Sequence, residues 1–136
     1  MLKKMKLEDV AVKHLKIDDE FDIIFNDATV LAASKKIKEK SIPDLVVINK
    51  EKKVLGTVST FDIVTKIVSE NKNAENINVI QIMVKLRPFT LETKIIDAFD
   101  IMQKEKIEVV PVTDSEGKLL GVITIMDVFA VMETLS

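Results

Sequence analysis

A short string of residues that could hold a polar ligand occurs twice in the sequence. The first copy runs from Gly56 to Asp62 (GTVSTFD) and the second from Gly121 to Asp127 (GVITIMD). Each copy has a glycine, a hydroxyl residue three positions later, and an aspartate three positions after that. Each copy lies at the end of a predicted strand, residues 54–59 or 119–124. We therefore expect the hydroxyl and the acid at a junction between a strand and a helix.

Two interpretations of this string are open from the residues alone. A Ser or Thr three residues before an acid forms a capping box, so Ser59 and Thr124 would only begin helices. In the other interpretation, Asp62 and Asp127 accept hydrogen bonds from both hydroxyls of a ribose, and the neighbouring hydroxyl side chains bind the same sugar. The glycine in each copy permits close approach of a backbone or a ligand. Repetition of the whole string favours the ribose interpretation.

The string is part of a longer internal repeat, in which residues 27–67 align without a gap onto 92–132. Each copy predicts a helix, two strands joined into a hairpin, and a last helix. The first helix is expected to be capped by Asn26 or Asp27 in one copy and by Thr93 in the other. The predicted elements of the two copies are helices near 30–37 and 95–102, strands at 45–48, 54–59, 109–112 and 119–124, and last helices at about 62–69 and 127–134.

The repeat predicts an α/β (α+β) fold made of two pseudo-symmetric halves, each a small sheet flanked by helices. The first half covers residues 1–69, a polar linker 70–78, and the second half 79–136. One half alone would leave a sheet face uncovered, so we expect the halves to pack sheet to sheet as one module. A pseudo-two-fold axis would then create two equivalent clefts between them.

Composition excludes several kinds of site. The chain has no cysteine and one histidine, His14, so thiolate and histidine-based metal sites and catalytic triads are not expected. We predict no catalytic residue and no metal ligand. No signal peptide or apolar run of membrane-spanning length is found, which predicts a cytoplasmic protein without membrane contact. Twenty basic residues against twenty-two acidic ones give no general attraction to nucleic acid.

The motifs together resemble the CBS domain, named after cystathionine β-synthase. The resemblance depends on residues 107–114 (IEVVPVTD) followed by the string that ends at Asp127. The second copy matches from residue 79 to 132. The first copy is looser, because Pro43 falls three places early and Asp44 stands where Val109 stands. The chain is similar to a tandem CBS pair that covers nearly its whole length.

The resemblance implies reversible binding of an adenosine-type nucleotide, AMP, ADP, ATP or S-adenosylmethionine, in clefts between the two repeats. Ser59 with Asp62, and Thr124 with Asp127, would hold the riboses. Arg87 and Lys85 precede a segment expected to touch the base, and a guanidinium suits phosphate. The residues expected near adenine are Ile24, Phe25, Ile42, Leu45, Phe89, Thr90, Val110 and Pro111.

The resulting hypothesis is a regulatory module that needs no obligatory cofactor and is not an enzyme. The resemblance also implies a homodimer, and we expect signalling through an unidentified regulated protein. A second hypothesis is a ligand-free interaction or dimerisation module, in which the strings serve only as helix caps. Binding of nucleic acid through the lysines of residues 35–40 is a third and less favoured hypothesis.

Overall fold

The computed structural model describes residues 2–18 and 21–135, which fall into two compact units. Residues 20–87 form one unit, here called the central unit. Residues 1–19 and 88–136 form the other, here called the terminal unit. Each unit contains a small sheet and helices, so the predicted mixed α/β class is confirmed.

The central unit has a three-stranded sheet in the order β1-β2-β3, in which β1 runs parallel to β2 and β2 runs antiparallel to β3. Helix α1 packs Val30 and Ala33 against Leu45 and Val58 of the sheet in a core that excludes water. Its elements are β1 (Asp22–Phe25), α1 (Val30–Lys40), β2 (Asp44–Ile48), β3 (Val54–Ser59), α2 (Thr60–Ile63), the π-helical segment η4 (Val64–Val68), and the 3₁₀ turns η5 (Ala74–Asn76) and η6 (Val79–Gln81).

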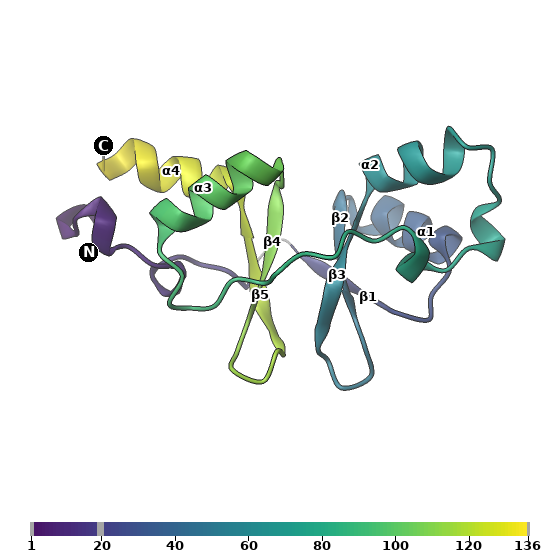
Figure 1. Ribbon diagram of the computed structural model, residues 1–136, viewed down its shortest axis with the longest axis horizontal. Helices are drawn as coiled ribbons and strands as arrows, with labels where there is room; N and C mark the ends of the chain where they lie inside the picture. The colour runs from purple at the N-terminus through teal and green to yellow at the C-terminus, as the bar shows by residue number, and fades with distance from the viewer. Residues whose placement is uncertain (1, 19–20, 136) are drawn as a thin grey trace. The chain divides into compact units, whose positions relative to one another are not determined.

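The terminal unit is built on an antiparallel hairpin, and helices α3 and α4 lie at the same end of it (Figure 1). The rings of Phe99 and Phe129 meet edge to face with centroids 5.7 Å apart, which fixes α3 against α4. A bridge between Phe89 and Val112 repeats the parallel pairing of β1 with β2. Its elements are η1 (Leu2–Lys4), η2 (Leu7–Asp9), η3 (Val12–His14), α3 (Ile95–Glu105), β4 (Val109–Thr113), β5 (Leu119–Thr124) and α4 (Ile125–Leu135).

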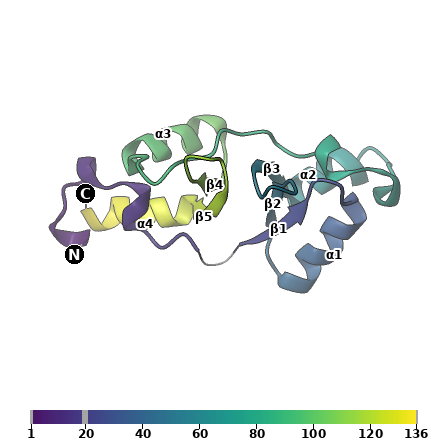
Figure 2. The same cartoon turned by 90° about the horizontal axis from the view of Figure 1, so that it is seen from below.

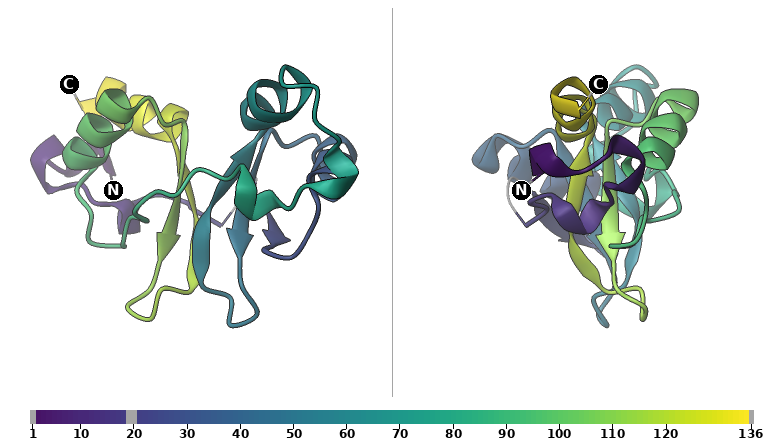
Figure 3. Two further views of the ribbon diagram at one scale, coloured as in Figure 1. Left: turned by 45° about the vertical axis from the view of Figure 1, so that its right-hand side comes forward. Right: turned by 90° about the vertical axis from the view of Figure 1, so that its left-hand side faces the viewer.

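The N-terminal segment belongs to the terminal unit, where it runs beside α3 and α4 (Figures 2 and 3). The backbone N–H of Ile95 donates to the carbonyl of Val10 at 2.9 Å, and that of Val122 donates to Ile17 at 2.8 Å. These bonds join the first residues of the chain to residues about a hundred positions later. The compact units therefore divide the chain differently from the sequence repeats expected at 1–69 and 79–136.

Residues 77–84, which follow η4, make equivalent backbone hydrogen bonds in the central unit. The N–H of Val30 donates to the carbonyl of Ile77 at 2.8 Å, and Thr57 and Val84 exchange two backbone hydrogen bonds of 3.0 and 2.8 Å. Val30 and Thr57 are the repeat partners of Ile95 and Val122. Residues 10–17 and 77–84 are therefore equivalent segments, each of which completes one unit.

Both string glycines lie where these segments cross a strand. A Cβ built on Gly56 would stand 2.4 Å from the carbonyl oxygen of Val84, and one on Gly121 would stand 2.0 Å from that of Ile17. Only a residue without a side chain allows such an approach. The two glycines therefore serve close contact of backbone with backbone, one of the two uses that the sequence left open.

The helix starts differ in detail from the sequence prediction. The cap of α1 is Thr29, whose Oγ1 accepts a hydrogen bond from the N–H of Ala32, and neither Asn26 nor Asp27 takes this place. Thr93 accepts from the N–H of Thr90 instead of capping α3. The predicted caps were wrong because several short polar residues precede each helix, and the sequence does not say which one has extended backbone at the cap position.

The turns of the two hairpins have the same hydrogen bonds but differ in charge, with an aspartate in one and an asparagine in the other. The Oδ1 atom of Asp114 accepts from the N–H groups of Glu116 and Lys118, and Asn49 makes the same two bonds in the central unit. The bonds from Lys118 and Glu116 lower the pKa of Asp114 below its ordinary 3.8. A lowered pKa stabilises the fold above the unfolded-state pKa and loses this contribution as pH falls through the folded-state value.

We therefore expect Asp114→Asn to keep the turn and remove this acid-dependent part of stability. Thermal melts should show a small loss of stability at about pH 7, where the charged carboxylate contributes in full, and a smaller difference from the unmodified chain below about pH 4. The reverse exchange, Asn49→Asp, should add such a dependence to the other turn. An equal difference between Asp114→Asn and the unmodified chain at both pH values would contradict the role of the charge.

Candidate functional site

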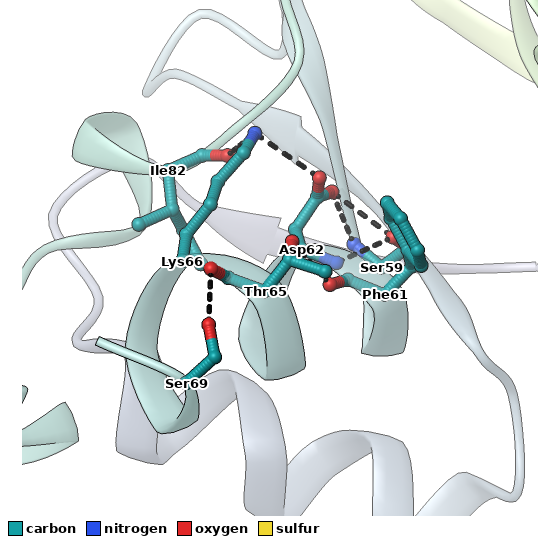
Figure 4. Close-up of polar contacts among 7 residues, drawn as sticks. All are labelled: Ser59, Phe61, Asp62, Thr65, Lys66, Ser69 and Ile82. Carbon is teal, nitrogen blue, oxygen red and sulfur yellow. Dashed lines mark hydrogen bonds and ion pairs between the residues drawn. The ribbon is translucent and has the colours of Figure 1, made fainter. Parts of the chain in front are cut away.

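The junction between β3 and α2 places the first string in a closed set of hydrogen bonds (Figure 4). Ser59 is the cap of α2, and its Oγ accepts from the N–H of Asp62 at 3.1 Å. In return Oδ2 of Asp62 accepts from the N–H of Ser59 at 2.9 Å and from its hydroxyl at 3.0 Å. The capping interpretation is therefore correct for this copy.

Lys66 occupies the other oxygen of the same carboxylate (Figure 4). Its Nζ lies 3.1 Å from Oδ1 of Asp62 and donates to the carbonyl of Ile82 at 2.9 Å. The side chain of Asp62 is 7% exposed and that of Lys66 is 42% exposed. An ion pair with one buried partner is screened less by water than a surface pair, so this lysine holds the acid in place.

The junction between β5 and α4 repeats the cap without the lysine. The N–H of Thr124 donates to Oδ2 of Asp127 at 3.0 Å, and the N–H of Asp127 donates to Oγ1 of Thr124 at 3.1 Å. Within residues 2–18 and 21–135, no hydrogen bond or ion pair reaches Oδ1 of Asp127. The cap uses one oxygen of the acid and leaves the other available.

The two acids differ in how much acceptor capacity remains. An ionised carboxylate offers about four lone-pair sites. Asp62 accepts from the Ser59 N–H, the Ser59 hydroxyl and Lys66, whereas Asp127 accepts only from the Thr124 N–H among the described residues. A pair of neighbouring hydroxyls needs two acceptors, which Asp127 has and Asp62 lacks. Capping and ligand binding are thus compatible at Asp127.

Strand pairing brings part of the predicted base site next to each junction. Ser59 pairs with Asp44 across β2 and β3, and the N–H of Thr60 donates to the carbonyl of Pro43. Ile42 and Leu45 therefore flank the first junction. In the terminal unit Thr124 pairs with Val109, which places Val110 and Pro111 beside the second junction.

The remaining predicted base contacts lie further along the strands. Ile24 pairs with Val47 and Phe25 with Ile48, which are three and four residues along β2 from the partner of Ser59. At about 3.3 Å per residue, this separation is about 10 Å or more. Phe89 is displaced in the same way, because it bridges to Val112. These sheets do not bring Ile24, Phe25, Phe89 or the adjoining Thr90 to the acids.

Burial separates the predicted residues further. Ile24 and Leu45 belong to the hydrophobic core of the central unit, and Phe89 and Val110 are also buried, so packing accounts for these side chains. Arg87 and Lys85 are exposed and free to reach an anion. His14 accepts a hydrogen bond from the N–H of Ala11 at its Nδ1, which is a local turn contact. The assignments to base and phosphate stay predictions.

Lys66 is the site residue that the sequence analysis did not identify. Its spacing from Asp62 is i, i+4, the separation at which an acid and a lysine meet on one helix face. This spacing can be read from the sequence. Alignment of the two copies also shows that Lys66 has no charged counterpart, since Val131 stands at the matching place in the second copy.

Comparison with known proteins gives the same family as the motifs. The family model described as "CBS domain" matches residues 12–69 and 79–134. An uncharacterized 17.7 kDa protein of Acidianus ambivalens is 31% identical over 106 residues, which cover 77% of this chain and 63% of that protein. The chain spans 63% and 53% of the lengths of two curated relatives that it matches. No helix within the described ranges has the length and apolar character to cross a membrane.

Solved structures share the fold. The crystal structure of CBSX2 in complex with AMP has a TM-score of 0.76 at 20% identity and covers 92% of this chain and 97% of its own. The CBS domain pair of protein MJ0100, in complex with 5′-methylthioadenosine and S-adenosyl-L-methionine, has a TM-score of 0.76 at 21% identity and covers 93% and 98%. With two matched domains and this fold, the chain belongs to the CBS domain family and is a tandem CBS pair.

Proposed function

We propose that this CBS pair is a regulatory module that reversibly binds an adenosine-type nucleotide through Thr124 and Asp127. The observation that carries the proposal is the free Oδ1 atom of Asp127 beside the hydroxyl of Thr124, within the part of the chain that the structure describes. One oxygen of the acid begins the helix, and the other can accept from a ribose hydroxyl. The cap holds the carboxylate in one orientation before the ligand arrives, which reduces the entropy lost on binding.

The ligand class is supported by two proteins of the same fold. CBSX2 is in complex with AMP, and the MJ0100 pair with 5′-methylthioadenosine and S-adenosyl-L-methionine. All three ligands contain adenosine, and the ribose is the part that an acid and a hydroxyl can bind. AMP, ADP, ATP and S-adenosylmethionine are therefore the candidates here, with Arg87 and Lys85 as candidate phosphate contacts.

Regulation needs no chemical step. A nucleotide that binds one conformation better than another shifts the population toward that conformation, and a regulated protein that recognises it receives the signal. In this proposal the chain is not an enzyme and the nucleotide is its ligand, neither substrate nor obligatory cofactor. A cytoplasmic location fits such a sensor, because nucleotide levels change there.

Thermal melts with AMP, ATP and S-adenosylmethionine test the proposal. Ligand that binds only the native state adds about 2.7 kcal/mol at a concentration one hundred times the dissociation constant. For a chain of this length, we expect a rise of roughly 9 °C in the midpoint. Inosine monophosphate is the base control and ribose 5-phosphate the sugar control. An unchanged midpoint with all three adenosine ligands at millimolar concentration would contradict nucleotide binding.

A second function, association of two copies, is favoured by exposed apolar side chains at the end of each string and in the helix that follows it. Phe61 is 72% exposed and stands beside exposed Val64 and Val68, and Met126 is 69% exposed near Phe129. Phe61 and Val64 are the repeat partners of Met126 and Phe129, so each unit presents the same kind of helix face. Exposed apolar patches of this kind mark interaction sites, and a self-complementary face suits a symmetric dimer.

We therefore expect the unmodified chain to be a dimer by light scattering and Phe61→Glu to shift it toward monomer. Ile80→Glu is the matched control, because Ile80 is also exposed but lies outside these helix faces. A monomeric unmodified chain would contradict the association. A dimer with no ligand response would instead support a ligand-free interaction module. RNA binding with steep salt dependence would support the lysine surface.

A further inference from the structure

The helices that follow the two strings differ in charge at one matched position, four residues after each aspartate. Lys66 in the central unit corresponds to Val131 in the terminal unit, and Val131 is buried and apolar. The helix differs there as well, since Val64–Val68 is π-helical whereas α4 runs as an α-helix from Ile125 to Leu135. The sequence repeat therefore conceals an electrostatic difference between two otherwise similar junctions.

We propose that Lys66 determines nucleotide stoichiometry by occupying the ribose acceptor of the first site, so that the chain binds one nucleotide, at Asp127. This inference rests on the proposed nucleotide function and adds to it which of the two sites accepts ligand. Lys66 acts here as an internal occupant of the Asp62 carboxylate. A lysine at the matching place in the second repeat would close that site in the same way.

The contacts explain why a ribose would not displace this lysine readily. The ammonium is held by Oδ1 of Asp62 at 3.1 Å and by the carbonyl of Ile82 at 2.9 Å (Figure 4). A diol that took Oδ1 would have to separate a charged pair whose acid is buried, and the ribose hydroxyls are neutral. It would also leave the Ile82 carbonyl without its lysine donor.

The hydroxyl of Ser59 adds to the difference. It donates to Oδ2 of Asp62, so its hydrogen is already used, and the carboxylate has about one lone-pair site left. Among the described residues none accepts a hydrogen bond from the Thr124 hydroxyl, so this hydroxyl can turn toward a sugar. Hydrogen bonds to charged groups are strong enough that losing one or two acceptors weakens binding by about tenfold to a thousandfold.

Isothermal titration of the full chain with AMP, and with uncharged adenosine, measures the number of sites. We expect one site in the unmodified chain, two in Lys66→Met, and one in the double variant Lys66→Met with Asp127→Asn. Methionine keeps the length of the aliphatic side chain and removes the ammonium. Losing a positive charge lowers the general attraction for AMP, so a gained site is opposite to the simple electrostatic effect.

Two control variants separate occupation of the acid from charge. Lys66→Arg retains a cation that can pair with Asp62, so it should keep one site. Lys72→Met makes the same charge change at an exposed lysine away from the junction and should also keep one site. Thermal melts of each variant without ligand establish that it is folded.

The outcomes distinguish the inference from the proposed function. Two sites in the unmodified chain, or one site in Lys66→Met together with no binding by the double variant, would overturn the role of Lys66 and leave nucleotide binding at Asp127 intact. Binding of one ligand by both Lys66→Met and the double variant, with none by the unmodified chain, would support the role of Lys66 and remove the proposed site at Asp127. No binding of AMP or adenosine by any of the proteins would overturn both.

Discussion

Replacing Gly121 with alanine is expected to destabilise the protein by about 3 kcal/mol or more, which is the upper range for inserting a methyl group into a packed site. The new Cβ would stand 2.0 Å from the carbonyl oxygen of Ile17 and 2.6 Å from its carbonyl carbon. Both are backbone atoms and cannot rotate away, so the segment must leave β5. For this chain length, the thermal midpoint should fall by roughly 10 °C.

Gly117→Ala is the matched control for this effect. Gly117 lies in the turn of the same hairpin at a φ of 83°, and a Cβ there meets no atom within 4 Å. Alanine at Gly117 has only the cost of left-handed backbone, about 1–2 kcal/mol. Hydrogen exchange at the N–H of Val122, which donates to Ile17, should be fastest in Gly121→Ala. Equal losses in the two variants would contradict the steric explanation.

Asp127→Asn is expected to abolish most of the nucleotide-dependent rise in thermal midpoint while leaving the ligand-free midpoint close to that of the unmodified chain. One amide oxygen can still accept from the N–H of Thr124, so the cap is retained. The amide nitrogen then stands at the free position, where a donor replaces the acceptor that a ribose hydroxyl needs. Affinity should fall about tenfold or more, measured by titration calorimetry.

Asp127→Ala complements Asp127→Asn, because it removes both roles of the acid at once. It removes the cap bond as well as the ribose acceptor, so both the ligand-free midpoint and the ligand response should fall. A lost cap interaction costs about 1 kcal/mol. If Asp127→Asn keeps the full response to AMP, the carboxylate is only a helix cap and the proposed site is wrong.

The sequence was sufficient to predict the repeat, the family and the position of the acids. The 65-residue spacing, the β-branched strands and the GxxSxxD and GxxTxxD strings each carry a local signal, so the hairpins and the junctions could be predicted. The capping box was foreseen as one of two interpretations. The first copy forms this capping box, whereas in the second copy Asp127 caps with Oδ2 and its Oδ1 has no partner among the described residues.

The unit that each of the segments 10–17 and 77–84 completes could not be predicted in the same way. Residues 10–17 join β5 and the start of α3 through backbone hydrogen bonds, which any residue except proline can form as donor. Their spacing from residues 77–84 is 67 rather than 65, so the ungapped repeat does not include them. The distance of Ile24 and Phe25 along the strands from the acids could not be predicted for a related reason, because strand register is set by pairing and not by the order of residues.

The two units differ in when their residues become available during synthesis of the chain. The central unit is one continuous stretch, residues 20–87, so all of its residues are present before residue 88 is made. The stretch that pairs with Val122 is translated earlier but must wait for more than a hundred further residues. Until residues 91–95 and Val122 emerge, the backbone groups of residues 10–17 that bond to them have no native partner, so the terminal unit is completed last.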